Sequence, residues 1–283
     1  MSLKNTRTST PESAGPVSSH ADRHLLYQQA VQDVVSEIDF VEETWAELRR
    51  RPAALLREDF CGTANTACEW VRRDDRHYAV GVDLDESVLE WGRLNNLSRL
   101  NAEEKERIEL VHDDVMQVRP GLSDIILAMN FSYYLFRERH ELREYFANAL
   151  DGLVSDGILF LDAYGGYEAP MVLEEKRDCT DDDGNPFVYI WDQATFNPIN
   201  SCMTCNIHFE FADESRIENA FSYQWRLWTL PEIREILLEA GFSKVEVYWE
   251  GTDEERNEGN GVYLPSEQGD ADAGWVCYIV AEV

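Results

Sequence analysis

Acidic side chains follow three short apolar runs of this sequence, where they could bind the hydroxyl and amino groups of a nucleoside. Glu58 comes after the first run, Asp83 after the second and Asp114 after the third. An ionised carboxylate accepts several O–H or N–H bonds, which suits ribose hydroxyls, and it repels phosphate. Asp83 lies 25 residues after Glu58, near the spacing at which an acid binds the ribose of a dinucleotide.

A single glycine joins the first apolar run to a helical pattern. The segment 58–64 reads EDFCGTA, and strand, tight turn and helix in that order are typical of the ligand-binding entrance of a Rossmann-like unit. Gly62 lets the backbone approach a ligand, and the free N–H groups of the helix start could bind one. We expect Thr63 to cap this helix. The alternative is an ordinary buried strand followed by a capped helix.

Strand and helix patterns alternate around these acids. After a first strand near residue 54, apolar strands are expected at 78–82, 108–111, 124–129 and 157–161, and helices at 87–100 and 138–150. This alternation is typical of an α/β fold with a parallel sheet and helices on both faces. The last two expected strands, 245–248 and 275–281, have no helix between them, so one of them should run antiparallel.

Four segments are expected along the chain. They are a disordered tail at 1–20, helices at 21–52 that cap the site, a Rossmann-like domain at 53–165 and 229–283, and an inserted antiparallel β lid at 166–228. The lid should contain a polar loop at 177–184 and strands at 187–196, 202–211 and 217–228. Ser, Thr, Pro and Gly dominate the tail, whereas the lid has strand-like segments separated by short turns.

Composition limits the partners. The 283 residues carry a net charge of −30, which would repel nucleic acid and anionic membranes. No apolar run approaches the roughly 20 residues that span a bilayer, and no signal peptide is recognisable, so we expect a cytoplasmic protein. Its acidic surface favours a neutral or cationic small molecule as partner.

The cysteines are expected to be reduced thiols rather than metal ligands. Cys202 and Cys205 stand three residues apart on a predicted strand, and His208 follows them. Side chains three apart on a strand point to opposite faces, so the two thiols could not share a zinc ion or a disulfide without leaving the strand. We expect no metal site.

The glycine turn and the acids that follow the apolar runs come in an order along the chain that resembles the motifs of the class I S-adenosylmethionine-dependent methyltransferases. The segment 58–64 lies where that family has its acid-x-Gly-x-Gly-x-Gly turn, 80–83 (VGVD) matches its ribose-binding motif, and 113–115 (DDV) matches the segment where an Asp receives the adenine amine. The segment 237–242 (LLEAGF) is similar to the approach to the family's sixth strand. Phe60 and Ala64 depart from the pattern, because they stand where the family has its first and third glycines.

The resemblance implies a seven-stranded, mostly parallel Rossmann-like sheet with an antiparallel last strand, an enzyme of the EC 2.1.1 class, and S-adenosylmethionine as cofactor. The implied cofactor-binding residues are Arg57, Glu58, Phe60, Cys61, Gly62, Thr63, Asp83, Leu84, Asp114, Val115 and Asn130. Among these, Arg57 would pair with the carboxylate of the methionine part.

Polar and aromatic residues elsewhere are candidates for the acceptor side. Tyr133 and Asp162 are the expected catalytic residues, and the expected substrate-binding residues are Tyr27, Tyr134, Tyr164, Trp191 and Trp228. Aromatic rings attract cations, so they would suit a sulfonium and an amine. The segment 130–133 (NFSY) stands where amine-directed relatives carry Asn/Asp-Pro-Pro-aromatic, and both prolines are missing.

These observations favour methyl transfer to a small-molecule acceptor, with nitrogen favoured over oxygen. A non-catalytic nucleoside-binding or regulatory protein of the same fold is the alternative. An NAD-dependent dehydrogenase is less favoured, because the G-x-G-x-x-G turn is missing and the last strands are antiparallel. The aromatic lid could also form the contact of a homodimer.

Overall fold

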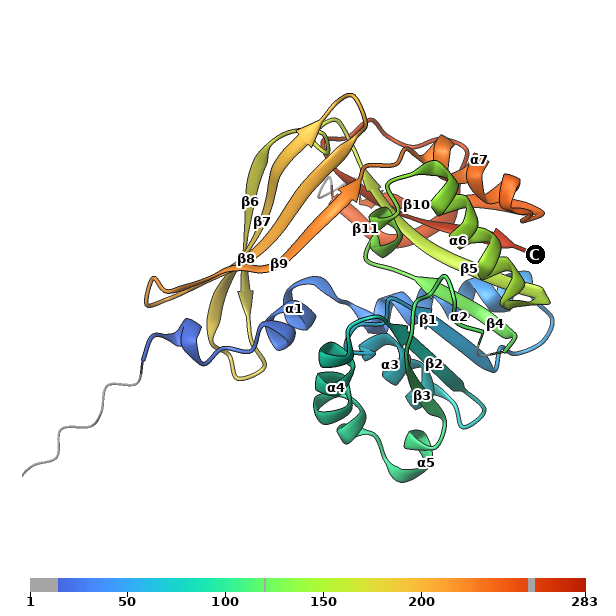
Figure 1. The fold of residues 1–283 in the computed structure, drawn as a ribbon, viewed down its shortest axis with the longest axis horizontal. Coiled ribbons are helices and arrows are strands. Elements are labelled where there is room, and N and C mark those ends of the chain that lie inside the picture. The colour runs from blue at the N-terminus through green and yellow to red at the C-terminus, as the bar shows by residue number, and fades with distance from the viewer. Residues whose placement is uncertain (1–14, 120, 254–257) are drawn as a thin grey trace, which may run out of the picture.

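An eight-stranded sheet forms the centre of the protein in the computed structural model, which describes residues 15–119, 121–253 and 258–283 (Figure 1). The strand order is β11-β10-β12-β5-β4-β1-β2-β3. The strands are β1 (Leu55–Asp59), β2 (Tyr78–Asp83), β3 (Ile108–His112), β4 (Ser123–Ala128), β5 (Leu153–Gly165), β10 (Lys244–Asp253), β11 (Glu258–Pro265) and β12 (Trp275–Glu282). Strands β1 to β5 pair in parallel, whereas β12 runs antiparallel to both β5 and β10.

The predicted mixed sheet with an antiparallel last strand is therefore confirmed, but it has one strand more than expected. The additional strand is β11, which pairs antiparallel with β10 and lies between the last two expected strands, 245–248 and 275–281. Tyr263 is the β11 residue that packs inward, against Phe40 and Tyr278. Its neighbours Val262 and Leu264 are apolar but exposed, so the sequence around Tyr263 lacks the alternation of apolar and polar residues that predicts a strand.

Seven α-helices and three short 3₁₀ helices surround the strands of the described ranges. They are η1 (Val17–Ser19), α1 (Arg23–Val31), α2 (Val34–Leu48), α3 (Asn65–Arg73), α4 (Glu86–Asn95), η2 (Leu97–Arg99), α5 (Ala102–Lys105), η3 (Ser132–Leu135), α6 (Arg139–Asp151) and α7 (Leu230–Ala240). Of the tail expected to be disordered, residues 1–14 lie outside the described residues. Within 15–20 the chain forms η1, because Asp213 accepts the N–H of Val17 at 2.9 Å.

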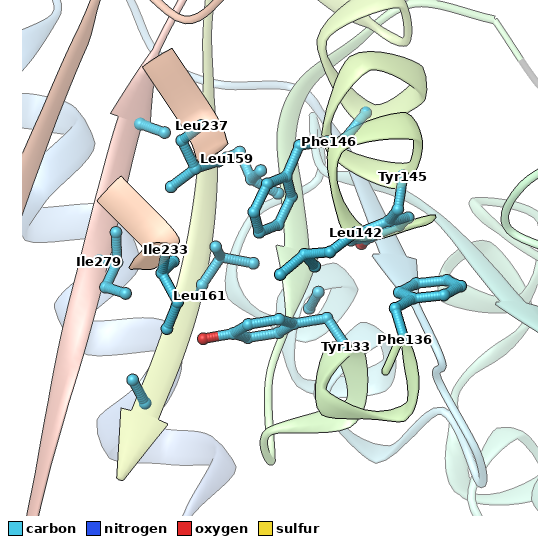
Figure 2. Packing of buried hydrophobic residues seen from close by; sticks show 14 of the residues in the cluster. Tyr133, Phe136, Leu142, Tyr145, Phe146, Leu159, Leu161, Ile233, Leu237 and Ile279 are labelled. Carbon is cyan, nitrogen blue, oxygen red and sulfur yellow. The ribbon is translucent and has the colours of Figure 1, made fainter. Parts of the chain in front are cut away.

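Helices cover both faces of the eight-stranded sheet. On one face α6 and α7 bury Leu142, Phe146 and Leu237 against Leu159 and Leu161 of β5 (Figure 2). On the other face α2 and α3 bury a second cluster that includes Ile38, Val41 and Trp70. Burying a large aliphatic or aromatic side chain contributes about 1.5–3 kcal/mol, so the two clusters fix the carboxyl ends of the parallel strands relative to one another.

Four antiparallel strands form a separate sheet, in the order β6-β7-β8-β9. They are β6 (Leu173–Thr180), β7 (Pro186–Asn197), β8 (Cys202–Phe211) and β9 (Arg216–Arg226). The polar loop predicted at 177–184 needs correction, because its first half, residues 177–180, belongs to β6. That strand forms an edge of the sheet and its side chains are mostly exposed and charged, as edge strands that avoid further pairing often are.

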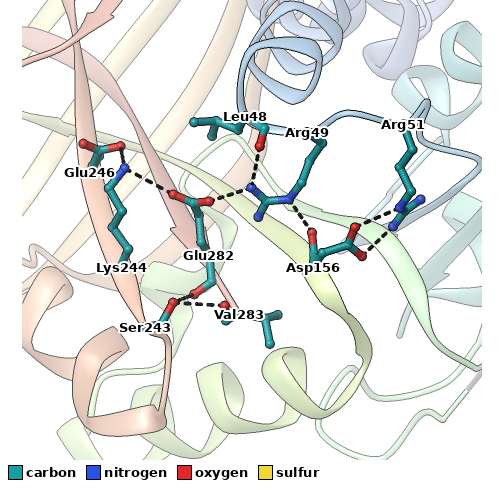
Figure 3. Close-up of polar contacts among 9 residues, drawn as sticks. All are labelled: Leu48, Arg49, Arg51, Asp156, Ser243, Lys244, Glu246, Glu282 and Val283. Atoms are coloured by element: carbon teal, nitrogen blue, oxygen red, sulfur yellow. Dashed lines mark hydrogen bonds and ion pairs between the residues drawn. The ribbon is translucent and has the colours of Figure 1, made fainter.

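The N-terminal helices are attached to both sheets. Helix α1 lies between the four-stranded sheet and α4 (Figure 1), with Leu26 and Ala30 packed on the sheet and Asp22 accepting the indole N–H of Trp91 at 2.7 Å. After α2, Arg49 bonds to the Glu282 carboxylate at 2.6 Å and Arg51 binds the Asp156 carboxylate (Figure 3). These contacts attach α1 to the four-stranded sheet and to α4, and the segment after α2 to β5 and β12.

Three further findings concern metals, thiols and membranes. No group of three His, Cys, Asp or Glu in the described part of the chain could hold a metal ion. All six cysteines are free thiols, including Cys202 and Cys205 of β8. No helix of the described ranges is long and apolar enough to cross a membrane.

Candidate functional site

A cavity of about 750 Å³ lies at the carboxyl ends of β1, β2, β3 and β4, and α1 and β9 complete its wall. In open α/β sheets this edge, near the point where strand order reverses, is where ligands bind. The order of the strands reverses here between β4 and β2, on either side of β1. A second cavity, of about 780 Å³, lies between α1 and the β6–β7 turn and touches no strand end of the eight-stranded sheet. The first cavity is therefore the candidate site.

Three residues of the turn after β1 adopt the left-handed conformation. Phe60, Gly62 and Ala64 have φ values of 57°, 53° and 56°, and they occupy the three positions at which the resemblance expects glycines. A non-glycine residue pays roughly 1–2 kcal/mol for this conformation, and such strain clusters at functional sites. The sequence departs from the glycine pattern, but the backbone keeps the conformation that the glycines would adopt.

The first helix after this turn is capped differently from the prediction. Helix α3 begins at Asn65 with Ala64 as its N-cap and no side-chain cap, so the expectation that Thr63 caps it is wrong. The Thr63 hydroxyl instead accepts a hydrogen bond from Gln28 of α1 at 2.7 Å. Thr63 therefore connects the turn to the helix that closes the cavity.

Asp83 and Asp114 stand at the ends of neighbouring strands and both line the cavity. Asp83 accepts the N–H of Gly62 at 2.8 Å and that of Asp85 at 2.9 Å, one on each carboxylate oxygen. Asp114 accepts the N–H of Met116 at 2.9 Å through one oxygen. Each carboxylate oxygen can accept a second hydrogen bond, so both side chains can bind hydroxyl or amino groups while they hold their loops.

Glu58 is a buried acid in the same wall. One of its carboxylate oxygens accepts the N–H of Ala67, in the first turn of α3, at 2.9 Å. Burial raises the pKa of Glu58 to about 8, and repulsion from Glu37 and Asp83 acts in the same direction. A cationic group that entered the cavity beside Glu58 would favour the ionised carboxylate.

Arg57 is directed away from the cavity, and its predicted role needs correction. Side chains alternate along β1, so Arg57 and Asp59 share the face opposite to Glu58. The guanidinium binds the Asp59 carboxylate through two bonds of 2.6 and 3.0 Å, and both side chains are buried. Tyr145 donates a further hydrogen bond to Asp59 at 3.0 Å. Arg57 therefore neutralises a buried acid instead of binding the carboxylate of a ligand.

The two residues expected to be catalytic also lie outside the cavity lining. Asp162 is buried behind the loop that follows β4, and its carboxylate accepts backbone N–H groups of that loop. The hydroxyl of Tyr133 donates to the backbone oxygen of Asp162 at 2.8 Å, and burial raises its pKa well above the ordinary tyrosine value. Figure 2 shows the Tyr133 ring among the core residues under α6. Tyr133 is thus a core residue with a satisfied hydroxyl.

Most of the expected substrate residues are structural as well. Tyr134 donates to the backbone of Tyr164, Trp228 donates to the backbone of Phe136, and Tyr164 and Trp191 pack against each other beside Trp225. Of this group only Tyr27 lines the cavity. The predicted cofactor residues that do line it are Glu58, Phe60, Cys61, Gly62, Thr63, Asp83, Leu84, Asp114, Val115 and Asn130.

Strand β9 supplies a wall whose residues are not among the expected substrate-binding residues. Phe221, Tyr223 and Trp225 line the cavity, and the rings of Tyr223 and Trp225 stack at 4.4 Å. These residues alternate along the strand, so a period of two could have identified them as one face. His24 of α1 also lines the cavity, and no sequence pattern indicates that α1 would come to lie beside β9.

Comparisons with known proteins agree with this geometry. No family model matches the chain. A protein of Geobacillus sp. (strain WCH70), provisionally named a methyltransferase, is 23% identical over 225 residues, which cover 77% of this chain and 86% of that protein. The structure of an S-adenosylmethionine-dependent methyltransferase from Clostridium acetobutylicum superposes with a TM-score of 0.66 at 15% identity, covering 91% of this chain and 96% of that one.

A third comparison includes a bound cofactor. CalS10, an amino pentose methyltransferase from Micromonospora echinaspora, was solved with S-adenosylmethionine bound and superposes with a TM-score of 0.65 at 14% identity, covering 92% of this chain and 96% of that one. The chain has the fold of the S-adenosylmethionine-dependent methyltransferases. The two superpositions cover 91% and 92% of this chain.

Proposed function

We propose that this protein transfers a methyl group from S-adenosylmethionine to a small-molecule acceptor, with nitrogen favoured over oxygen. The observation that carries the proposal is the convergence of the Gly62 turn, Asp83 and Asp114 in one cavity at the switch point of this fold. Asp83 would bind the ribose hydroxyls and Asp114 the adenine amine. Glu58 would face the ammonium group of the methionine part.

The acceptor would occupy the part of the cavity between Asn130, Tyr27 and β9. Among the described residues, no lysine or arginine lines this cavity, so a phosphate or carboxylate on the acceptor would find no cationic partner. Aromatic residues of β9 would attract the sulfonium or a cationic amine at about 0.5–2 kcal/mol per favourable contact. An amine can attack with its own lone pair once neutral, which is why nitrogen is favoured.

In the proposed reaction the acceptor nitrogen would form a bond to the methyl carbon while the carbon–sulfur bond would break, with its electron pair left on sulfur. Such an in-line displacement needs the two reacting atoms to be held close and aligned, and exclusion of water assists it. In this chain α1 and β9 would exclude water, and the turn at Gly62 would fix the cofactor.

The test is turnover with S-adenosylmethionine and matched pairs of amines and alcohols, including amino sugars and their hydroxy analogues. We expect S-adenosylhomocysteine to form with amines. Turnover of alcohols alone would refute nitrogen as acceptor. Cofactor binding without turnover of any pair would favour the alternative, a non-catalytic nucleoside-binding protein.

Partners and location are proposals of the same kind. The acceptor would be a small molecule, with neither nucleic acid nor membrane as partner, and the protein would act in the cytoplasm. A homodimer formed through the four-stranded sheet is also proposed, and light scattering of the purified chain tests it.

A further inference from the structure

The loop between β4 and η3 is strained at two successive residues. Asn130 and Phe131 have φ values of 57° and 56°, and neither is a glycine. The left-handed conformation costs roughly 1–2 kcal/mol at Phe131 and less at Asn130, because asparagine adopts it more readily. The surrounding structure must therefore over-determine the conformation of Phe131 in particular. Asn130 and Ser132 line the cavity on either side of Phe131.

Asp162 of β5 supplies the contacts that hold this loop. One carboxylate oxygen accepts the N–H of Asn130 at 2.7 Å, and the other accepts the N–H of Phe131 at 2.8 Å. Successive backbone N–H groups that converge in this way form a concave binding place for an anion. The backbone oxygen of Asp162 accepts the hydroxyl of Tyr133 at 2.8 Å, so one residue makes three hydrogen bonds to the same short segment.

The loop packs against the aromatic wall of the cavity. The Phe131 ring lies 4.9 Å from the ring of Tyr164 and 6.2 Å from that of Trp225. A shift of the two strained residues would therefore move Asn130 in the cavity wall and alter the packing against β9 at the same time.

We propose that Asp162 is a positioning residue for the methyl transfer, because its ionised carboxylate fixes the left-handed Asn130–Phe131 loop and with it the acceptor side of the cavity. This inference rests on the proposed function. It assigns Asp162 no contact with the substrate, in contrast to the catalytic role expected from the sequence.

The protonation state of Asp162 decides whether the loop is held. An ionised carboxylate accepts both N–H groups, whereas a protonated one offers a poor acceptor to one of them. Burial raises the pKa of Asp162 to about 7, and the N–H groups of Phe131 and Asn130 act against that rise. The titratable groups that face it are Glu37 of α2, Tyr133 and Tyr134 of η3, Tyr263 of β11, and Cys277 and Tyr278 of β12. Activity should therefore fall as pH decreases through about 7.

The test compares Asp162→Asn with wild type in the full chain, and Asp156→Asn, at the other end of the same strand, is the matched control. We expect Asp162→Asn to lower kcat/KM for the acceptor by ~10–100-fold, since small displacements of positioning groups cost that much. Its affinity for S-adenosylmethionine should stay within about threefold of wild type. With the acceptor concentration expressed as neutral amine at each pH, the acid limb of kcat/KM near pH 7 should disappear. Asp156→Asn should behave as wild type.

A second readout does not depend on turnover. Amide hydrogen exchange of residues 130–131 should accelerate in Asp162→Asn, and in wild type when the pH is lowered below 7 after correction for intrinsic rates. Unchanged exchange, an unchanged kcat/KM or a retained acid limb in Asp162→Asn would overturn the proposal. So would an equal loss of cofactor affinity, which would mean that Asp162 supports the whole site. Failure of wild type to bind the cofactor would instead refute the proposed function, and exchange would still decide whether Asp162 holds the loop.

Discussion

Replacing Arg57 by methionine separates the two roles that have been considered for this residue. In the structure the guanidinium is bound to Asp59 by two hydrogen bonds and is 1% exposed. One of its nitrogens lies 2.9 Å from the place where a Cβ of Gly152 would be, at the C-terminal end of α6. Arg57→Met keeps most of the buried volume but leaves the Asp59 carboxylate with only the hydrogen bond from Tyr145.

The expected effect is a large loss of stability. Removal of one partner from a buried ion pair costs about 3–5 kcal/mol, because an uncompensated acid remains in the interior. For a chain of this size, 1 kcal/mol corresponds to about 2–4 °C in Tm, so Tm should fall by about 6–20 °C. The double variant Arg57→Met/Asp59→Leu should recover much of this loss, since it removes the buried charge together with its partner.

Denaturant unfolding and thermal melts measure the stability, and calorimetry on the folded variant measures cofactor affinity. We expect the dissociation constant for S-adenosylmethionine to stay within about threefold of wild type, which is less than the tenfold change that 1.4 kcal/mol would cause. An Arg57→Met protein of wild-type stability with at least tenfold weaker cofactor binding would refute this reasoning. It would mean that the guanidinium reaches the carboxylate of the methionine part.

Three further predictions concern the cofactor turn, pH and salt. Gly92→Ala should lower the unfolding free energy by about 1–3 kcal/mol and weaken cofactor binding, because the added Cβ would lie 2.6 Å from the backbone oxygen of Thr63. Gly274→Ala is the neutral control in the unfolding and binding assays, because its Cβ meets nothing within 4 Å. Burial raises the pKa of Glu58 from 4.5 to about 8, so the folded chain keeps a proton that the unfolded chain loses. The unfolding free energy should then fall as pH rises through this range, and Glu58→Gln should flatten the dependence in melts. The net charge of −30 should make the folded chain repel itself, and salt should screen this repulsion because the Debye length falls from about 10 Å at 0.1 M salt to 3 Å at 1 M. We therefore expect Tm to rise with KCl concentration. A Tm that falls would contradict net self-repulsion as the main salt effect.

The sequence predicts the parallel part of the fold well, because its signals are local. Buried parallel strands read as continuous apolar runs, as in β4 (Ser123–Ala128), whose residues are all buried. The acids at the strand ends, Asp83 and Asp114, could be placed in one cavity from topology alone. The edge strand β6 was missed because its exposed, charged side chains hide the period of two. The edge strand β11 (EGNGVYLP) was missed because glycine, asparagine and proline, which strands disfavour, make up half of it.

The acceptor side could not be predicted because tertiary contacts decide it. Tyr133, Tyr134 and Trp228 look like polar or aromatic candidates in the sequence, but each hydroxyl or indole N–H is bound to a backbone oxygen in the interior. Whether such a side chain faces a cavity depends on the approach of β9 and η3, which are about 90 residues apart in the sequence. Arg57 was misassigned for a simpler reason, since alternation along β1 directs it away from Glu58.

Calorimetric titration with S-adenosylmethionine and S-adenosylhomocysteine tests the central claim most directly, with wild type, Asp83→Ala and the Asp156→Asn control. We predict micromolar binding of both nucleosides to wild type and to the control. In Asp83→Ala the affinity should fall by ~100-fold or more, since hydrogen bonds to a charged group contribute about 1.5–3 kcal/mol each. If wild type bound neither nucleoside, this cavity would not be a cofactor site and the methyltransferase proposal would be contradicted.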